Sequence, residues 1–147
     1  KKHLHMTVCP TLVKEHSAQA NICQNYNLAI LTPIRGNLVY LSGQGAGGEP
    51  TAGNVLRDLL YVRAGQREML PENIVEKAAS NQELKSKFLI RVHQESSFDS
   101  SNWLEKSWIV EQTKYVLTQK VSAIDVFEKM HTLRKSEEVF FAMFDEE

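Results

Sequence analysis

Four glycines lie close together in the first third of the chain: Gly43, Gly45, Gly47 and Gly48. They follow a short apolar run that ends at Leu41, and they precede a helical pattern that begins at Pro50. A strand, a glycine turn and a helix in this order present N–H groups at the start of a helix, which suit a phosphate or a ribose. The first chemistry that this spacing indicates is the binding of a nucleotide cofactor.

The spacing Gly43-x-Gly45-x-x-Gly48 matches the dinucleotide fingerprint GxGxxG. That fingerprint also needs a second parallel strand soon after the helix, ending near an acidic residue that holds the ribose. Glu68 lies about 20 residues further on, as the fingerprint asks, but a polar segment from Arg63 carries it instead of an apolar strand. From spacing alone, a tight turn that packs a helix against a strand stays an open alternative.

The same stretch resembles the segment that closes the catalytic region of homoserine dehydrogenases, whose pattern is approximately GxGAGxxPTAxxVxxDL. Residues 43–59 carry this pattern. Upstream, residues 8–13 resemble the substrate-domain strand of that family, and residues 26–30 resemble its asparagine-alanine strand. The resemblance covers residues 6–66 and implies that the chain is the C-terminal portion of such an enzyme.

The resemblance implies a parent reaction, the NAD(P)-dependent interconversion of L-homoserine and L-aspartate 4-semialdehyde in threonine and methionine biosynthesis. It also implies that six residues approach the coenzyme: Gly45, Ala46, Gly47, Gly48, Glu49 and Thr51. The catalytic lysine and aspartate of the family have no counterpart here. We therefore expect no catalytic residue, no metal site and no bound cofactor in this fragment alone, and we expect its N-terminal nucleotide-binding domain to be missing.

Composition is that of an ordinary globular protein, with 42% hydrophobic and 24% charged residues in 147. A net charge of −1 gives no electrostatic reason to expect nucleic acid or an anionic membrane as a partner. No apolar run approaches the roughly 18 residues of a membrane-spanning helix, and no secretion signal is visible. We expect a cytoplasmic protein in which Cys9 and Cys23 are reduced.

The elements that would position the glycine turn are a small antiparallel sheet and a returning helix. Apolar runs over 27–32 and 38–41 flank a turn at Gly36-Asn37, which predicts a hairpin. An edge strand that ends at Pro10 is expected to precede them in the same sheet.

The returning helix is predicted over residues 50–64. Ala52, Val55, Leu56, Leu59 and Leu60 repeat at the spacing of one helix face. Pro50 suits a first helical position, because the N–H that proline lacks would have no partner within the helix there. Gly65 suits the position just after the end of the helix.

Residues 85–147 predict a second unit with the order β-(short α)-β-β-α-β. Strands are expected over 87–94, from 108, over 115–121 and over 138–144. A single helical turn is expected over 102–106, and a helix from the N-cap Ser122 to Arg134. The side chains that this helix should turn inward are Ile124, Phe127, Met130 and Leu133.

That order is similar to an ACT domain, the ferredoxin-like amino-acid-binding regulatory module that homoserine dehydrogenases often carry after the catalytic region. ACT domains place a glycine-containing turn between the first strand and a full first helix, and the effector binds against that turn. Residues 95–101 contain neither glycine nor proline, and the interval before Trp108 is too short for a full helix. Binding of an effector such as threonine and a degenerate module kept for assembly both stay open.

The whole chain is therefore expected to be α+β, with a catalytic-region tail over 1–66, a connector helix over 67–84 and an ACT-like unit over 85–147. The last strand has an apolar second face made by Phe140, Ala142 and Phe144, which indicates burial on both faces. We expect a homodimer through this unit. A stand-alone amino-acid-binding or dimerisation module without catalysis is the competing prediction.

Overall fold

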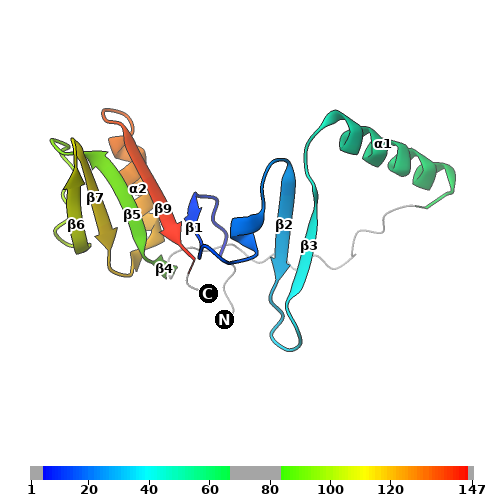
Figure 1. Cartoon of the computed structure of the whole chain (residues 1–147), viewed down its shortest axis with the longest axis horizontal. Coiled ribbons are helices and arrows are strands. Elements are labelled where there is room, and N and C mark those ends of the chain that lie inside the picture. Colours follow the sequence, from blue (N-terminus) through cyan, green and yellow to red (C-terminus); the bar gives the residue numbers. More distant parts are fainter. Residues whose placement is uncertain (1–4, 67–83, 146–147) are drawn as a thin grey trace. The chain divides into compact units, whose positions relative to one another are not determined.

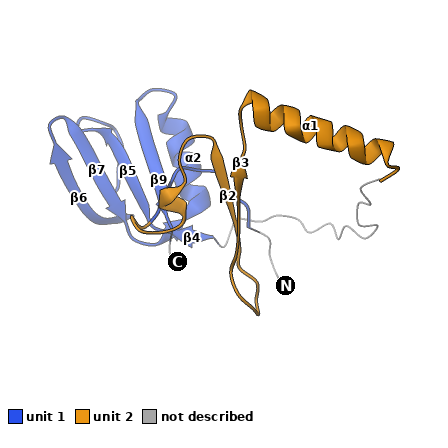
Figure 2. Ribbon diagram, turned by 45° about the vertical axis from the view of Figure 1, so that its right-hand side comes forward, with its two compact units in different colours: residues 1–13, 76–147 blue, residues 14–75 orange. Residues whose placement is uncertain are grey.

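The computed structural model describes residues 5–66 and 84–145. The chain divides into two compact units: residues 1–13 with 76–147, called unit 1, and residues 14–75, called unit 2 (Figure 2). The predicted connector helix over 67–84 falls almost entirely outside the described residues. The predicted domain boundaries therefore stay predictions, and each unit is described by itself.

Unit 2 is built on an antiparallel hairpin. Strand β2 (Tyr26–Leu31) pairs with β3 (Val39–Gln44), and Leu31 lies opposite Val39 beside the turn (Figure 1). Gly36 in that turn has a φ of +110°, a conformation that residues with a Cβ rarely adopt. The predicted hairpin is confirmed, with β3 running three residues further than expected.

Helix α1 (Gly48–Arg63) follows β3 after a loop of three residues. It starts two residues before the predicted position, so that Pro50 is its third residue and not its first. An N–H at that position has no acceptor within the helix either, which is why proline is tolerated there. The predicted stop is confirmed, because Gly65 has a φ of +72° just beyond the last turn.

Unit 1 is a five-stranded sheet covered on one face by a helix (Figure 1). Its strand order is β1-β9-β5-β7-β6, from strands β1 (Thr11–Leu12), β9 (Val139–Phe144), β5 (Phe88–His93), β7 (Thr113–Thr118) and β6 (Leu104–Val110). When the other four strands are numbered by their position in the sequence, they lie side by side in the order 4-1-3-2. This strand order is ferredoxin-like. A short pair, β4 (Lys85–Ser86) with β8 (Val121–Ser122), closes one end. The predicted α+β fold class is confirmed, and β6 follows β5 with no helix between them.

The helical turn predicted over 102–106 is wrong, because β6 already begins at Leu104. Strand pairing with β7 places Glu105 beside Lys87, whose Nζ lies 2.5 Å from the Glu105 carboxylate. The segment before β6 is held by Trp103, whose ring centroid lies 6.0 Å from the ring centroid of the buried Phe98. These contacts between distant residues override the local helical preference.

The predicted edge strand ending at Pro10 is also wrong. The residues just after Pro10 form β1 and pair in parallel with β9, where Thr11 lies opposite Met143. Proline has no N–H to donate to the hydrogen bonds of a sheet, but its carbonyl can accept one. The Met143 N–H donates to the Pro10 carbonyl oxygen at 2.9 Å. This segment therefore belongs to the sheet of unit 1 and not to the hairpin of unit 2.

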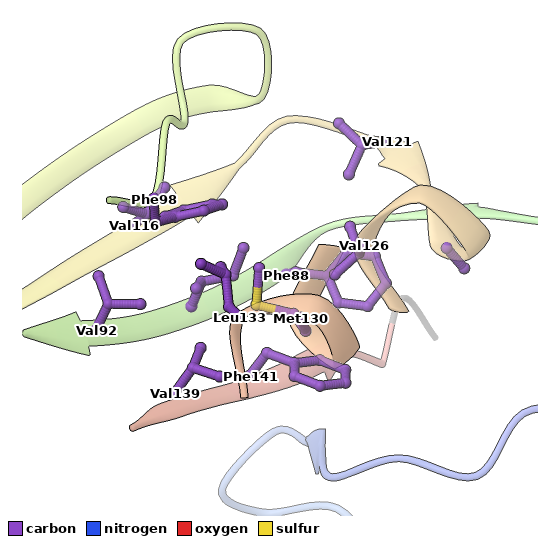
Figure 3. Packing of buried hydrophobic residues seen from close by; sticks show 12 residues of the cluster. Phe88, Val92, Phe98, Val116, Val121, Val126, Met130, Leu133, Val139 and Phe141 are labelled. Carbon is purple, nitrogen blue, oxygen red and sulfur yellow. The ribbon is translucent and has the colours of Figure 1, made fainter. Parts of the chain in front are cut away.

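Helix α2 (Ala123–Leu133) packs on the unit 1 sheet and supplies four of the twelve residues in its core cluster (Figure 3). Its buried residues are Ala123, Val126, Met130 and Leu133. The prediction placed Ile124 inward in place of Val126, and that was wrong. Successive residues lie about 100° apart around a helix of 3.6 residues per turn, so Ile124 points away from the direction of the buried Ala123, and the predicted stripe reaches the sheet only at Met130 and Leu133. Phe127 is partly buried at the margin of the core cluster, where its ring contacts the ring of Phe88 edge-on.

Replacing Ser122 by alanine tests the start of α2. The Ser122 hydroxyl accepts from the Asp125 N–H at 3.5 Å, as predicted from the sequence. Loss of this cap should destabilise unit 1 by about 1 kcal/mol, whereas Ser122→Gly should cost only a few tenths. Urea unfolding followed by tryptophan fluorescence measures both, and equal losses in the two variants would contradict a capping role.

Candidate functional site

The site indicated by the glycine pattern lies where β3 passes into α1. Residues 43–52 are exposed throughout, except for a half-buried Pro50. The loop is therefore open to a ligand or to another surface. An enclosed loop would have contradicted the cofactor-binding interpretation.

Asn25 holds the first half of the loop in place. The Gly45 N–H donates to the Asn25 carbonyl at 2.7 Å, and the Asn25 side-chain amide donates to the Ala46 carbonyl at 2.7 Å. A Cβ on Gly45 would lie 1.8 Å from the Asn27 side-chain nitrogen, so this position needs glycine for close approach. The sequence analysis missed Asn25, because nothing in local spacing shows that the start of β2 contacts this loop.

Gly47 shapes the second half of the loop and caps α1. Its backbone has φ 119° and ψ 150°, a region open almost only to glycine. Its carbonyl accepts from the Thr51 N–H at 3.1 Å and from the Thr51 hydroxyl at 2.7 Å. By helix geometry the N–H groups of Gly48 and Glu49 then have no acceptor within the helix, so two backbone donors mark the helix start.

The arrangement suits a polar group that carries hydroxyls better than a bare phosphate. Nothing lies within 4 Å of a Cβ built on Gly48, which leaves room for close approach of a ligand. The Glu49 side chain adds a carboxylate in the first turn, which accepts hydrogen bonds from hydroxyls and repels anions. All six predicted residues thus meet on one short segment.

A shallow groove of about 690 Å³ continues from the loop along α1, lined by Gly47, Gly48, Thr51, Ala52, Val55, Leu56 and Leu59. The apolar side chains of this helix are uncovered, and Leu59 is 62% exposed. Exposed stripes of this kind mark surfaces that bind another protein surface.

Residues 84–145 and 5–66 contain no group of three histidine, cysteine or acidic side chains that could hold a metal ion. Within the same residues no helix is long and apolar enough to cross a membrane.

A second polar cluster lies in unit 1, where the loop after β5 meets the segment before β9. The Glu137 carboxylate accepts hydrogen bonds from the hydroxyls of Ser96 and Ser97, the latter at 2.6 Å, and from the Ser97 N–H at 3.1 Å. The hydroxyl of Ser96, and then that of Ser97, hold the pKa of Glu137 below its ordinary value. The hydrogen-bond donors of Ser96 and Ser97 are thus already bound to Glu137. They lie in the turn against which an ACT effector was expected to bind.

Acidification should loosen this loop. Because the pKa of folded Glu137 is lowered, its contribution to stability is complete above the ordinary glutamate pKa of about 4.3 and is lost as pH falls below that value. The Ser97 amide signal, followed by NMR, should shift in that range, and Glu137→Gln should remove the shift. An unchanged titration in the variant would show that another group is responsible.

Comparison with known proteins supports the resemblance found in the sequence. The sequence model of the homoserine dehydrogenase family matches residues 2–60. No curated protein matches the chain by sequence.

Similar folds occur among solved structures. A homoserine dehydrogenase from Thiobacillus denitrificans aligns with a TM-score of 0.56 at 16% identity, over 92% of this chain and 37% of that one. Homoserine dehydrogenase from S. aureus aligns with a TM-score of 0.49 at 19% identity, over 93% of this chain and 36% of that one. The first similarity supports the fold, and the chain spans about 37% of that structure's length.

Proposed function

Residues 2–60 carry the sequence of the homoserine dehydrogenase family, and from that premise we propose that the chain is the C-terminal regulatory and assembly part of such an enzyme. The parent reaction would be the NAD(P)-dependent interconversion of L-homoserine and L-aspartate 4-semialdehyde. The observation that carries the proposal is the exposed loop over 43–52, which pairs the family's glycine pattern with an open helix start.

Six residues of that loop would approach the nicotinamide coenzyme in the assembled enzyme: Gly45, Ala46, Gly47, Gly48, Glu49 and Thr51. When bound, the coenzyme supplies the hydride acceptor. The chain's own part is to place the donors of Gly48 and Glu49 and the carboxylate of Glu49 beside a hydroxyl-bearing group such as a ribose. The unobstructed space around Gly48 fits a ligand of that kind.

The apolar groove of α1 would dock on the nucleotide-binding domain of the parent enzyme. This explains why a helix with exposed leucines is compatible with a folded protein. The catalytic lysine and aspartate of the family have no counterpart in this chain and would come from the rest of the parent enzyme, so the chain by itself should not transfer hydride.

Fragment complementation tests the proposal. The part of the T. denitrificans enzyme that this chain does not cover would be co-purified with the chain, and the formation of reduced coenzyme from L-homoserine would be measured. We expect activity only when both pieces are present. A purified complex of both pieces without activity, or no complex at all, would contradict the proposal.

Two lysine substitutions on α1 provide a matched pair for that experiment. Leu56→Lys places a charge in the groove, whereas Asn54→Lys makes the same change of charge outside it, and both positions are exposed. We expect Leu56→Lys to abolish complementation and Asn54→Lys to leave it intact. Equal effects would show that the groove is not the docking surface.

The second face of β9 supports a homodimer through unit 1. Ala142 is 1% exposed, and its neighbours Phe140 and Phe144 on the same face are half-buried. Covering this face with a second copy would remove the remaining apolar surface from water. Sedimentation velocity should show a dimer, and Phe144→Lys should shift it to monomer; a wild-type monomer at high micromolar concentration would contradict the dimer.

The alternative function, a stand-alone dimerisation or amino-acid-binding module, is favoured by one observation. Unit 1 has a closed core of its own, in which Phe88, Ile90, Val116 and Met130 are fully buried (Figure 3). A dimer that binds no catalytic partner would select this alternative.

A further inference from the structure

A strained turn just before β2 presents the first residues of that strand to the glycine loop over 43–52. The Tyr26 N–H donates to the Cys23 carbonyl at 3.2 Å and closes the turn. Inside it, Gln24 has a φ of +56°, a left-handed conformation that residues other than glycine rarely adopt. Strain of this kind persists where the surrounding structure enforces it, and it is concentrated at functional sites. The turn therefore indicates that the placement of the next residue, Asn25, has a function.

Asn25 fixes the backbone of the loop by two hydrogen bonds at once. Its carbonyl accepts from the Gly45 N–H, and its side-chain amide donates to the Ala46 carbonyl, each at 2.7 Å. An aspartate in this position would keep the first bond and lose the second, because a carboxylate has no hydrogen to donate. The side-chain bond can therefore be removed by a substitution that leaves the backbone bond in place.

Asn27 takes up the space beside Gly45. It lies opposite Gly43 in the hairpin, so its side chain is on the same face as Gly43 and Gly45. The nitrogen, carbon and oxygen of its carboxamide all lie within 2.9 Å of the place that a Cβ on Gly45 would take. A Cβ on Gly43 or Gly48, by contrast, would meet nothing within 4 Å. Gly45 thus makes room for a side chain of the protein itself, whereas Gly43 and Gly48 have open space beside them.

This arrangement differs from that of the dinucleotide fingerprint, in which the second glycine lets the backbone approach the pyrophosphate of the cofactor. Gly45 is the second glycine in the pattern Gly43-x-Gly45-x-x-Gly48, but the Asn27 carboxamide already fills the space beside it. A ligand would therefore approach the loop at Gly48 and Glu49, where the backbone donors of the helix start lie.

We infer that Asn25 and Asn27 are positioning residues for the coenzyme, and that Gly45 is a glycine to make room for Asn27 and not for the coenzyme. The two asparagines act through the loop: they hold it at Gly45, and the path of the loop sets the direction of the N–H groups at the start of α1. The inference rests on the coenzyme site proposed above and gives the start of β2 a part in it.

Steady-state kinetics in the complementation assay test Asn25. Asn25→Asp should raise the KM for the coenzyme at least about tenfold, because the donors at the helix start are then misplaced, and it should change kcat less than KM. A variant that merely unfolds would instead lower kcat and leave KM unchanged, since only folded molecules turn over.

Asn21→Asp is the matched control, because it makes the same change in the same unit. The Asn21 side-chain amide also donates to a backbone carbonyl, that of Ser17 at 2.8 Å, but it lies in the short helix η1 (Gln19–Asn21). This variant should keep the wild-type KM. A wild-type KM in Asn25→Asp, or an equal rise of KM in both variants, would overturn the positioning role.

A double-mutant cycle tests Asn27. Gly45→Ala should raise the KM for the coenzyme at least about tenfold in the wild-type chain, because the new methyl group displaces the Asn27 carboxamide and shifts the loop. In a chain that carries Asn27→Ala the methyl group has room, and the further effect of Gly45→Ala should be at most about twofold. Asn27→Ala alone should also raise the KM, since the loop then lacks one of its two supports. An equal effect of Gly45→Ala in both backgrounds would show that the glycine serves the coenzyme itself, and would overturn the inference.

Hydrogen exchange reports on the loop in the chain alone. Exchange of the Gly45 amide should accelerate about 5- to 10-fold in Asn25→Asp and stay unchanged in Asn21→Asp. Unchanged exchange in both variants would show that the Asn25 side chain does not hold the loop. A wild-type chain that fails to complement would overturn the dehydrogenase proposal and this inference together. Complementation by the wild type, with unchanged KM values in the asparagine variants, would overturn the inference alone.

Discussion

Replacing Phe88 by alanine should destabilise unit 1 by about 3–5 kcal/mol, because a fully buried aromatic side chain is lost and a cavity remains. Phe88 is 0% exposed, and its ring contacts those of Phe127 and Phe141, with centroids 6.1 Å and 6.5 Å away. Domains of this size have a total stability of about 5–15 kcal/mol, so this single change removes a large share.

Urea unfolding followed by tryptophan fluorescence measures the loss. Both tryptophans, Trp103 and Trp108, belong to unit 1, so the signal reports this unit alone. The midpoint should fall by about 1–5 M urea, the expected loss divided by a typical urea m-value. Phe140→Ala is the matched control, because this half-buried ring lies on the second face of β9; an equal loss in both variants would show that Phe88 is not at the centre of the core.

Local features of the structure could be predicted from the sequence. The hairpin around Gly36, the cap at Ser122 and the stop at Gly65 each depend on a few adjacent residues with strong conformational preferences. The strands over 88–93 and 139–144 also follow directly from alternating apolar residues.

Features that depend on distant residues could not be predicted in this way. Ser96 bonds to Glu137, which lies 41 residues away, and the short β1 strand pairs with the last strand of the chain. The inward stripe of α2 was misplaced because Ile124 and Val126 are equally apolar, and only the position of the sheet decides between them.

The same division applies to the candidate site. The glycines were visible as a pattern, whereas the clamp formed by Asn25 and the contact of Asn27 with Gly45 needed the fold of the hairpin.

Replacing Gly47 by alanine should damage the candidate site through backbone strain. At φ 119° and ψ 150° a Cβ is strained by about 1–3 kcal/mol. Relief of the strain must rotate the backbone and move the carbonyl that accepts from the Thr51 N–H and hydroxyl. Hydrogen exchange of the Thr51 amide should accelerate about 5- to 150-fold.

Gly53→Ala is the matched control, because it adds the same methyl group inside α1, where nothing lies within 4 Å of the new Cβ. Alanine in a helix interior should stabilise α1 by about 0.5–1 kcal/mol, so the two variants should change exchange in opposite directions. In the complementation assay Gly47→Ala should lower the rate of coenzyme reduction at least about tenfold, since the donors of Gly48 and Glu49 move with the turn. Gly53→Ala should preserve that rate. If both variants are fully active, the loop over 43–52 only connects β3 to α1, and the coenzyme is held elsewhere.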